Sequence, residues 1–154
     1  MERLILIETS TSLCSVALAE NGAVVREKVR SEPRAHASVT AMFVKEILEE
    51  GGLAVSDCDA VAVSKGPGSY TGLRVGVSTA KGLCFGAGIP LVSVGTLDTL
   101  VWKALDGGLL PEGCAHIVPL VDARRMEVYS GIFDTCGKQL TQTSATIVDG
   151  STFA

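Results

Sequence analysis

The sequence lacks the paired spacings that metal sites and disulfide frameworks require. Its five cysteines are odd in number, widely scattered and never spaced as C-x-x-C, and its two histidines lie far apart with no H-E-x-x-H pattern. The sequence therefore gives no support for a zinc-dependent hydrolase. It also contains no recognisable set of nucleophile, base and acid. We predict no metal site and no catalytic residues, and we interpret the cysteines as small core residues in a reducing compartment.

A strong basic patch and a long apolar run are missing as well. The net charge of -4 argues against a chain that holds nucleic acid by itself, and we interpret the pair Arg124 and Arg125 as a solvated face. The longest uncharged stretch, residues 82–97, is interrupted by glycine and proline, and the apolar run at residues 4–7 is too short for a signal peptide. We expect a cytoplasmic protein with no membrane partner.

The chain of 154 residues does contain an alternation of strand and helix signals, with 47% hydrophobic residues to build a core. An Asn-Gly pair between two apolar runs predicts a hairpin, and the short continuous apolar runs predict buried strands. The predicted elements are strands at 4–7, 13–19 and 23–29, a helix at 36–50, a strand at 60–63, a helix at 71–87, a strand at 91–94 and a helix at 97–105. The order is βββαβαβα, and its βα alternation predicts parallel strands joined by helical crossovers.

A linker at residues 107–113 precedes a second unit that resembles the start of the first. Asp122 follows a strand predicted at 116–121 as Glu8 follows the strand at 4–7, and a turn at Gly137 corresponds to the turn at Gly22, each about 115 residues later. A duplicated βββ unit explains this, although any two hairpins can look alike. We predict a first lobe at 1–105 and a second at 106–154 that stops after three strands. We therefore expect the chain to be the N-terminal part of something longer, or a partner to cover the open face.

Both long helices carry more small or apolar surface than one sheet contact needs. The first has a second apolar stripe, and the second has a row of small residues at i+4 spacing, where each glycine costs about 1 kcal/mol unless another backbone approaches closely. The close neighbour is either the protein's own sheet or first helix, or a second protein. The residues predicted to bind a partner are Val39, Phe43, Ile47, Gly72, Arg74, Gly76, Val77 and Ala80.

The loop at residues 64–74, SKGPGSYTGLR, joins a strand to a helix as phosphate-binding loops do. It offers no lysine at the Walker position, and its third glycine comes one place late for a dinucleotide loop. We therefore interpret it as a strand-to-helix elbow, with anion binding as the lesser alternative. The residues predicted to lie near an anion or nucleotide are Ser10, Thr11, His36, Gly68, Ser69, Asp122 and Arg124. Of these, Ser10, Thr11 and Asp122 lie where two sheet ends could face one cleft.

Three segments together resemble the TsaB family, also called YeaZ, of bacterial proteins for threonylcarbamoyladenosine synthesis on tRNA. They are Ile7 to Thr11 (IETST), Gly66 to Gly76 (GPGSYTGLRVG) and Asp122 to Tyr129 (DARRMEVY), and Arg34 to His36 also fits the family's pattern. The resemblance covers essentially the whole chain, although family members are substantially longer. It implies the actin, sugar kinase and heat-shock ATPase fold, which is ribonuclease H-like, as two duplicated βββαβαβα lobes with the second lobe incomplete here.

The resemblance further implies a non-catalytic partner of the related protein TsaD, whose metal-binding histidines correspond to Thr96 and Leu100 here. Such a protein docks on TsaD through its first two helices and supports threonylcarbamoyl transfer to the tRNA adenosine beside the anticodon. The implied partners are TsaD and TsaE, a second copy when the protein is alone, and tRNA only through the complex. The resemblance implies no cofactor for this protein itself. Any ATP or ADP would bind at the interface with TsaD. The rival hypotheses are a glycoprotease-like metallopeptidase and a small-molecule kinase of the same fold.

Overall fold

The computed structural model describes residues 1–31 and 36–152, with the side chains of residues 36–38 outside that description. The described residues form two compact units, residues 1–65 with 69–94 and residues 66–68 with 95–154. The elements in the first unit are β1 (Arg3–Glu8), β2 (Cys14–Glu20), β3 (Ala23–Arg30), α1 (His36–Glu49), the short 3-10 helix η1 (Val55–Asp57), β4 (Ala60–Ser64), α2 (Tyr70–Ala87) and β5 (Leu91–Val94). This order confirms the predicted succession of strands and helices.

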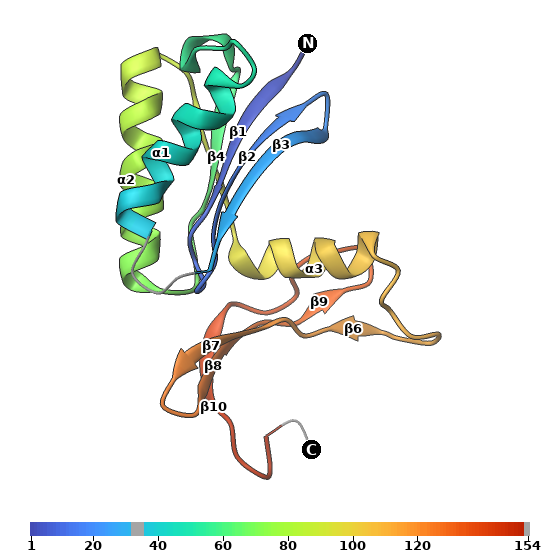
Figure 1. Cartoon of the computed structure of the whole chain (residues 1–154). Coiled ribbons are helices and arrows are strands. Elements are labelled where there is room, and N and C mark those ends of the chain that lie inside the picture. Colours follow the sequence, from blue (N-terminus) through green and yellow to red (C-terminus); the bar gives the residue numbers. More distant parts are fainter. Residues whose placement is uncertain (32–35, 153–154) are drawn as a thin grey trace. The chain divides into compact units, whose positions relative to one another are not determined.

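The first unit is a five-stranded sheet in the order β3-β2-β1-β4-β5. The strands β1, β2 and β3 pair antiparallel, whereas β4 and β5 run parallel to β1, as the crossover helices require. Helices α1 and α2 lie side by side along the sheet (Figure 1). Their apolar side chains share one core with alternate residues of the strands, among them Ile5, Val16 and Val61.

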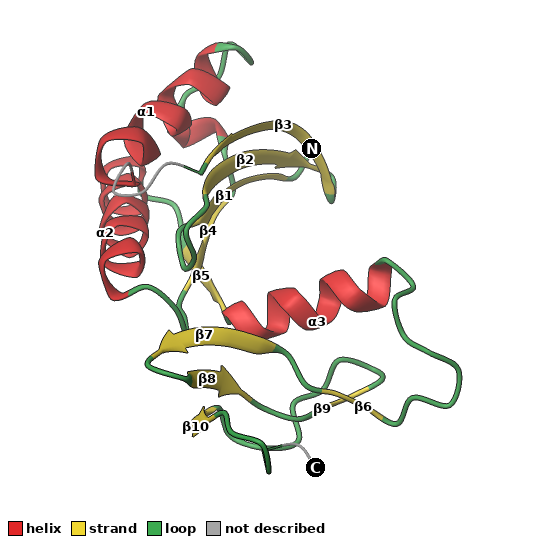
Figure 2. Ribbon diagram, turned by 60° about the horizontal axis from the view of Figure 1, so that its bottom comes forward, coloured by secondary structure: helices red, strands yellow, loops and turns green. Residues whose placement is uncertain are grey.

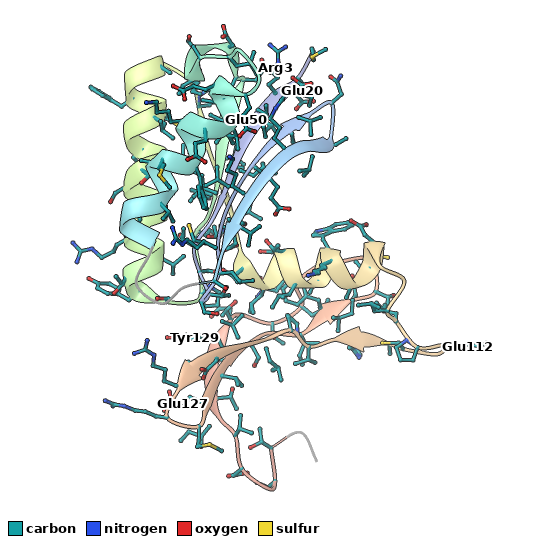
Figure 3. The ribbon with its side chains drawn as sticks, viewed as in Figure 1. Arg3, Glu20, Glu50, Glu112, Glu127 and Tyr129 are labelled. Atoms are coloured by element: carbon teal, nitrogen blue, oxygen red, sulfur yellow. The ribbon has the colours of Figure 1, made fainter. Side chains whose placement is uncertain are left out.

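Ion pairs reinforce the sheet and tie α1 to its edge. The Arg3 guanidinium contacts the Glu20 carboxylate at 2.9 Å from the directly opposite position of β2, and both residues are marked in Figure 3. Lys28 of the edge strand β3 reaches Glu46 of α1 at 2.9 Å and Glu50 at 2.6 Å. Hydrogen bonds to these two carboxylates raise the pKa of Lys28. Charged side chains on an edge strand such as β3 discourage pairing with another strand.

The expected spare stripe of α1 is buried within the first unit. Val39, Phe43 and Ile47 are at most 8% exposed, and Val44 and Leu48 on the other stripe are buried with them. The physical reason is that α1 packs against α2 as well as against β2 and β3, so both apolar stripes have an internal neighbour. The stripe formed by Val39, Phe43 and Ile47 therefore has an internal neighbour in the folded chain, and its assignment to a partner stays a prediction.

Strand β5 also departs from its prediction as a buried strand. All four of its residues are exposed, including Leu91, Val92 and Val94. Because β5 is the last strand of the sheet and pairs only with β4, it has a sheet neighbour on one side alone. A short apolar run identifies a strand, but it does not distinguish a central strand from an edge strand.

The second unit consists of one helix and two small antiparallel sheets (Figure 2). Its elements are α3 (Thr96–Asp106), β6 (His116–Ile117), β7 (Leu120–Arg124), β8 (Glu127–Ser130), β9 (Phe133–Asp134) and β10 (Ser144–Ile147). The sheet order β10-β8-β7 repeats the antiparallel order β3-β2-β1 of the first unit. The predicted strand at 116–121 is divided into β6 and β7, with Pro119, which has no N-H to donate, between them.

A separate apolar core explains why α3 belongs to the second unit. Leu97 and Val101 of α3 are buried in a cluster with Val121 and Phe133. The observed division therefore follows residue 94, whereas the predicted boundary at 105/106 assigns α3 to the first lobe. Within the described residues, no helix is both long and apolar enough to cross a membrane.

Candidate functional site

The loop that links β4 to α2 is an elbow fixed by hydrogen bonds. Ser69 caps α2, its side-chain oxygen accepting a hydrogen bond from the Gly72 N-H at 3.3 Å. The Ser69 N-H in turn donates to the Ser10 carbonyl at 2.6 Å, which joins the start of α2 to the end of β1. The N-cap explains why the helix begins at Tyr70.

The predicted ridge of small residues on α2 faces inward. A side chain at Gly72 would overlap the Thr9 carbonyl, and one at Gly76 would overlap the Thr9 hydroxyl. Farther along the ridge, Ala80 is fully buried and Cys84 is 9% exposed. Of the two alternatives left open by the sequence, an internal contact with Thr9, the residue that follows β1, accounts for this ridge without a partner.

Val77 is also packed against the core of the first unit. Among the partner-binding residues predicted on α2, only Arg74 is exposed. Its guanidinium lies 5.5 Å from the centre of the Tyr70 ring, a cation-π contact along the helix surface. A shallow hollow beside this pair is lined by Tyr70, Thr71, Arg74, Val75 and Ser78.

A second row of small residues occupies the outward face of α2. Thr71, Val75, Ser78, Gly82 and Gly86 fall within a narrow arc at 100° per residue. Added side chains at Gly82 and Gly86 would meet no atom within 4 Å. We call this row the outer stripe.

Phe85 lies beside the outer stripe and is 93% exposed. A glycine in the middle of a helix costs about 1 kcal/mol relative to alanine, and no internal contact explains that cost at Gly82 or Gly86. The partner residues predicted on α2 do not include this face, because four of the five are those of the inward ridge or its neighbour Val77. The G-x-x-x-G spacing of Gly82 and Gly86 is the signal that could have identified it.

The residues predicted near an anion are only partly brought together. Ser10, Thr11 and Ser69 lie in the first unit, Gly68, Asp122 and Arg124 lie in the second, and the side chain of His36 is outside the described residues. A cleft that joins the two groups stays a prediction.

Within the first unit, several donors that an anion could use are already engaged, although the buried Ser10 hydroxyl has no hydrogen-bond partner among the described residues. The Ser10 N-H donates to the Glu8 carboxylate at 2.6 Å, and the Ser64 hydroxyl donates to the same oxygen at 3.0 Å. The N-H groups of Ser69 and Gly72 are bonded within the elbow. Because a carboxylate already occupies this position, the geometry favours the interpretation as a structural elbow over a phosphate cradle.

Reactive thiols and metal-binding side chains are not grouped on the outward face of α2. Burial raises the pKa of the Cys84 thiol on the inward ridge and that of Cys58 at the end of the 3-10 helix. In the part of the chain that the structure describes, no three side chains of histidine, cysteine, aspartate or glutamate are grouped to hold a metal ion.

Comparison with known proteins identifies what this arrangement resembles. Residues 19–152 match the family model of TsaD, the tRNA N6-adenosine threonylcarbamoyltransferase. The tRNA threonylcarbamoyladenosine biosynthesis protein TsaB of Escherichia coli is 37% identical over 127 residues, which are 82% of this chain and 53% of that protein. The chain thus spans about half the length of the curated relatives it matches.

Solved structures agree with this match. A Pseudomonas aeruginosa protein described as similar to the peptidase YeaZ superposes with a TM-score of 0.81 at 32% identity, covering 95% of this chain and 67% of that one. An ADPNP-bound activator of 2-hydroxyisocaproyl-CoA dehydratase from Clostridium difficile superposes with a TM-score of 0.52 at 12% identity, covering 95% of this chain and 45% of that one. These likenesses confirm the predicted actin-like, ribonuclease H-like α/β fold.

Proposed function

Because this chain belongs to the TsaB (YeaZ) family, we propose that it is the non-catalytic subunit that binds TsaD and supports threonylcarbamoyl transfer to tRNA. In this assignment TsaD performs the transfer to the adenosine beside the anticodon. TsaE joins the same assembly, tRNA is engaged through the complex, and any ATP or ADP binds at the TsaD interface. Two copies of the chain pair when TsaD is absent.

The outward face of α2 is the observation that supports this proposal. Phe85 is 93% exposed, and an isolated phenylalanine in water forfeits the free energy that its burial would provide. Beside it, Gly82 and Gly86 leave the helix backbone open to approach. A large apolar side chain next to an open backbone groove suits a partner helix, which can lie close to the glycines while its own side chains cover the phenylalanine.

This surface differs from the one predicted from sequence, but it belongs to one of the two predicted helices. On α1, Met42 is 42% exposed and Lys45 and Glu49 are solvent-facing, so α1 contributes a mixed surface next to α2. A small apolar centre with charged residues at its margin is the usual composition of a specific interface. The proposed docking surface therefore comprises the outer stripe, Phe85 and the exposed side of α1.

Titration calorimetry of this chain with the TsaD protein of the same organism tests the proposal. We expect Phe85→Asp and Gly82→Leu each to weaken association by roughly thirtyfold or more, because one places a charge in the apolar centre and the other blocks helix approach. Leu109→Asp is the matched control for the first, since Leu109 is 70% exposed in the second unit. Lys103→Leu on α3 is the control for Gly82→Leu.

Both control variants should bind TsaD as the unaltered chain does, and all four variants should keep their circular dichroism spectra. Absence of association with TsaD would refute the proposed function. Undiminished binding by both Phe85→Asp and Gly82→Leu would refute the docking surface while leaving the partnership intact.

A further inference from the structure

The turn between β7 and β8 holds three consecutive residues in the left-handed backbone region. The φ angles are 67° at Arg124, 54° at Arg125 and 61° at Met126. For residues with a side chain this region is strained, and glycine or asparagine normally occupies it. The chain follows that rule at its other described left-handed positions, which are eight glycines and Asn21.

The hairpin itself could be built without this strain. A two-residue turn of this type favours Asn-Gly, the pair found at Asn21 and Gly22 between β2 and β3. Here the same geometry holds Arg125 and Met126, and Arg124 pairs with Glu127 directly after the register shift between β7 and β8 that leaves Ala123 unpaired. The strained backbone therefore points to a requirement for these side chains.

Neighbouring hydrogen bonds hold the turn in place without using the arginine side chains. The Arg124 N-H donates to the Asp122 carboxylate at 2.8 Å, and the Met126 carbonyl accepts from the Val148 N-H at 2.7 Å. Glu127, the first residue of β8 after the turn, is marked in Figure 3. The turn is thus preorganised before any ligand arrives.

The side chains displayed by the turn are fully available. Arg124 and Arg125 are exposed, Met126 is 71% exposed, and among the described residues neither guanidinium takes part in an ion pair or a hydrogen bond. Two adjacent guanidinium groups give this turn local positive charge in a molecule of net charge -4. Their planar forks match phosphate oxygens, and the neighbouring thioether can pack against a sugar or a base.

We propose that the β7–β8 turn is an RNA contact, in which Arg124 and Arg125 bind phosphates of the tRNA backbone and Met126 packs beside them. This inference rests on the proposed function, which makes tRNA the substrate of the assembly. Two phosphate contacts do not hold an RNA alone, so the turn adds affinity and orientation to a surface formed by the complex. An acidic protein segment is the competing ligand and would appear as an outcome of the test.

The test uses the complex of this chain with TsaD and a fluorescently labelled, unmodified tRNA transcript in an anisotropy titration. Replacing both arginines, Arg124→Gln with Arg125→Gln, should weaken tRNA binding roughly tenfold at low salt. The slope of log K against log salt concentration should fall by about 1.5, since about 0.7 to 0.9 is lost per phosphate contact. Lys138→Gln, which removes an exposed charge elsewhere in the same unit, should change neither quantity.

A glycine variant distinguishes an effect on tRNA binding from an effect on the stability of the fold. Arg125→Gly removes the guanidinium but relieves the backbone, so the melting temperature should not fall and should rise by about 2 °C. The affinity of this variant for tRNA should nevertheless decrease by the amount expected for the loss of one arginine contact. A structural role for Arg125 predicts the opposite pattern, with lower melting temperature and unchanged RNA affinity.

Association of the double variant with TsaD is measured in the same preparations. Normal association with weakened tRNA binding supports the proposal. Unchanged tRNA binding in the double variant would overturn it, as would an equal loss in Lys138→Gln. Lost association with TsaD and retained binding of free tRNA would instead identify a protein contact and overturn the RNA assignment. Failure of the unaltered chain to bind TsaD refutes the proposed function itself.

Discussion

Replacing two glycines of the same helix should change stability in opposite directions. Gly76 and Gly82 both lie inside α2, so alanine at either position improves helix propensity by about 1 kcal/mol. The new methyl group at Gly76 overlaps the buried Thr9 hydroxyl, whereas the one at Gly82 meets no atom within 4 Å. The difference between the two variants therefore measures the inward contact alone.

The magnitude follows from the opposing contributions. Overpacking a closed contact costs about 1 to 3 kcal/mol, so Gly76→Ala should have a lower free energy of unfolding than Gly82→Ala by that amount. We expect Gly82→Ala to be more stable than the unaltered chain by up to about 1 kcal/mol. In a chain of this size the two melting temperatures should differ by about 3 to 9 °C.

Urea and thermal denaturation followed by circular dichroism provide the measurement. A double-mutant cycle with Thr9→Ala sharpens it, since that substitution removes the hydroxyl and methyl group nearest the new side chain. Alanine at position 76 should be better tolerated with Thr9→Ala than without it. Equal stability of Gly76→Ala and Gly82→Ala, or no coupling between positions 9 and 76, would refute the inward assignment of the ridge.

Two further predictions concern ionisation and thiol reactivity. Hydrogen bonds from Ser151 and Thr152 lower the pKa of Asp149 from 3.8 to about 2, so its contribution to stability is present above about pH 4 and is lost as the pH falls through 2. An NMR titration should give a midpoint near 2 for its carboxyl group, and a midpoint near 4 would contradict those bonds. Cys136 is exposed whereas Cys58 is buried with a raised pKa. Iodoacetamide followed by mass spectrometry should therefore modify Cys136 first, and preferential modification of Cys58 in the native protein would count against the packing.

The sequence was sufficient to predict the element order because the signals for it are local. Apolar runs, the Asn21-Gly22 turn and glycine after α2 each act within a few residues. Even so, β5 is at the edge of its sheet, where its side chains are exposed. Its position depends on which strands pair, and strand pairing is not encoded in a four-residue run.

The outward surface was harder to predict for the same reason. Periodicity identified two apolar stripes on α1, but only the tertiary arrangement shows that Val39, Phe43 and Ile47 have an internal neighbour. On α2, two rows of small residues were available, and the close approach of Thr9 decides which one faces inward. The left-handed turn at Arg124 and Arg125 had no signal, because its sequence contains neither glycine nor asparagine.

The most direct test of the proposed function is reconstitution of threonylcarbamoyl transfer to a tRNA transcript, with an activated threonylcarbamoyl donor supplied to TsaD, to this chain, or to both. We predict product only when both are present, and at least a tenfold lower rate with Phe85→Asp at limiting concentration, because docking is weakened. The Leu109→Asp control should react at the unaltered rate. Product formation by this chain without TsaD, or an equal rate from TsaD with and without this chain, would contradict the proposal.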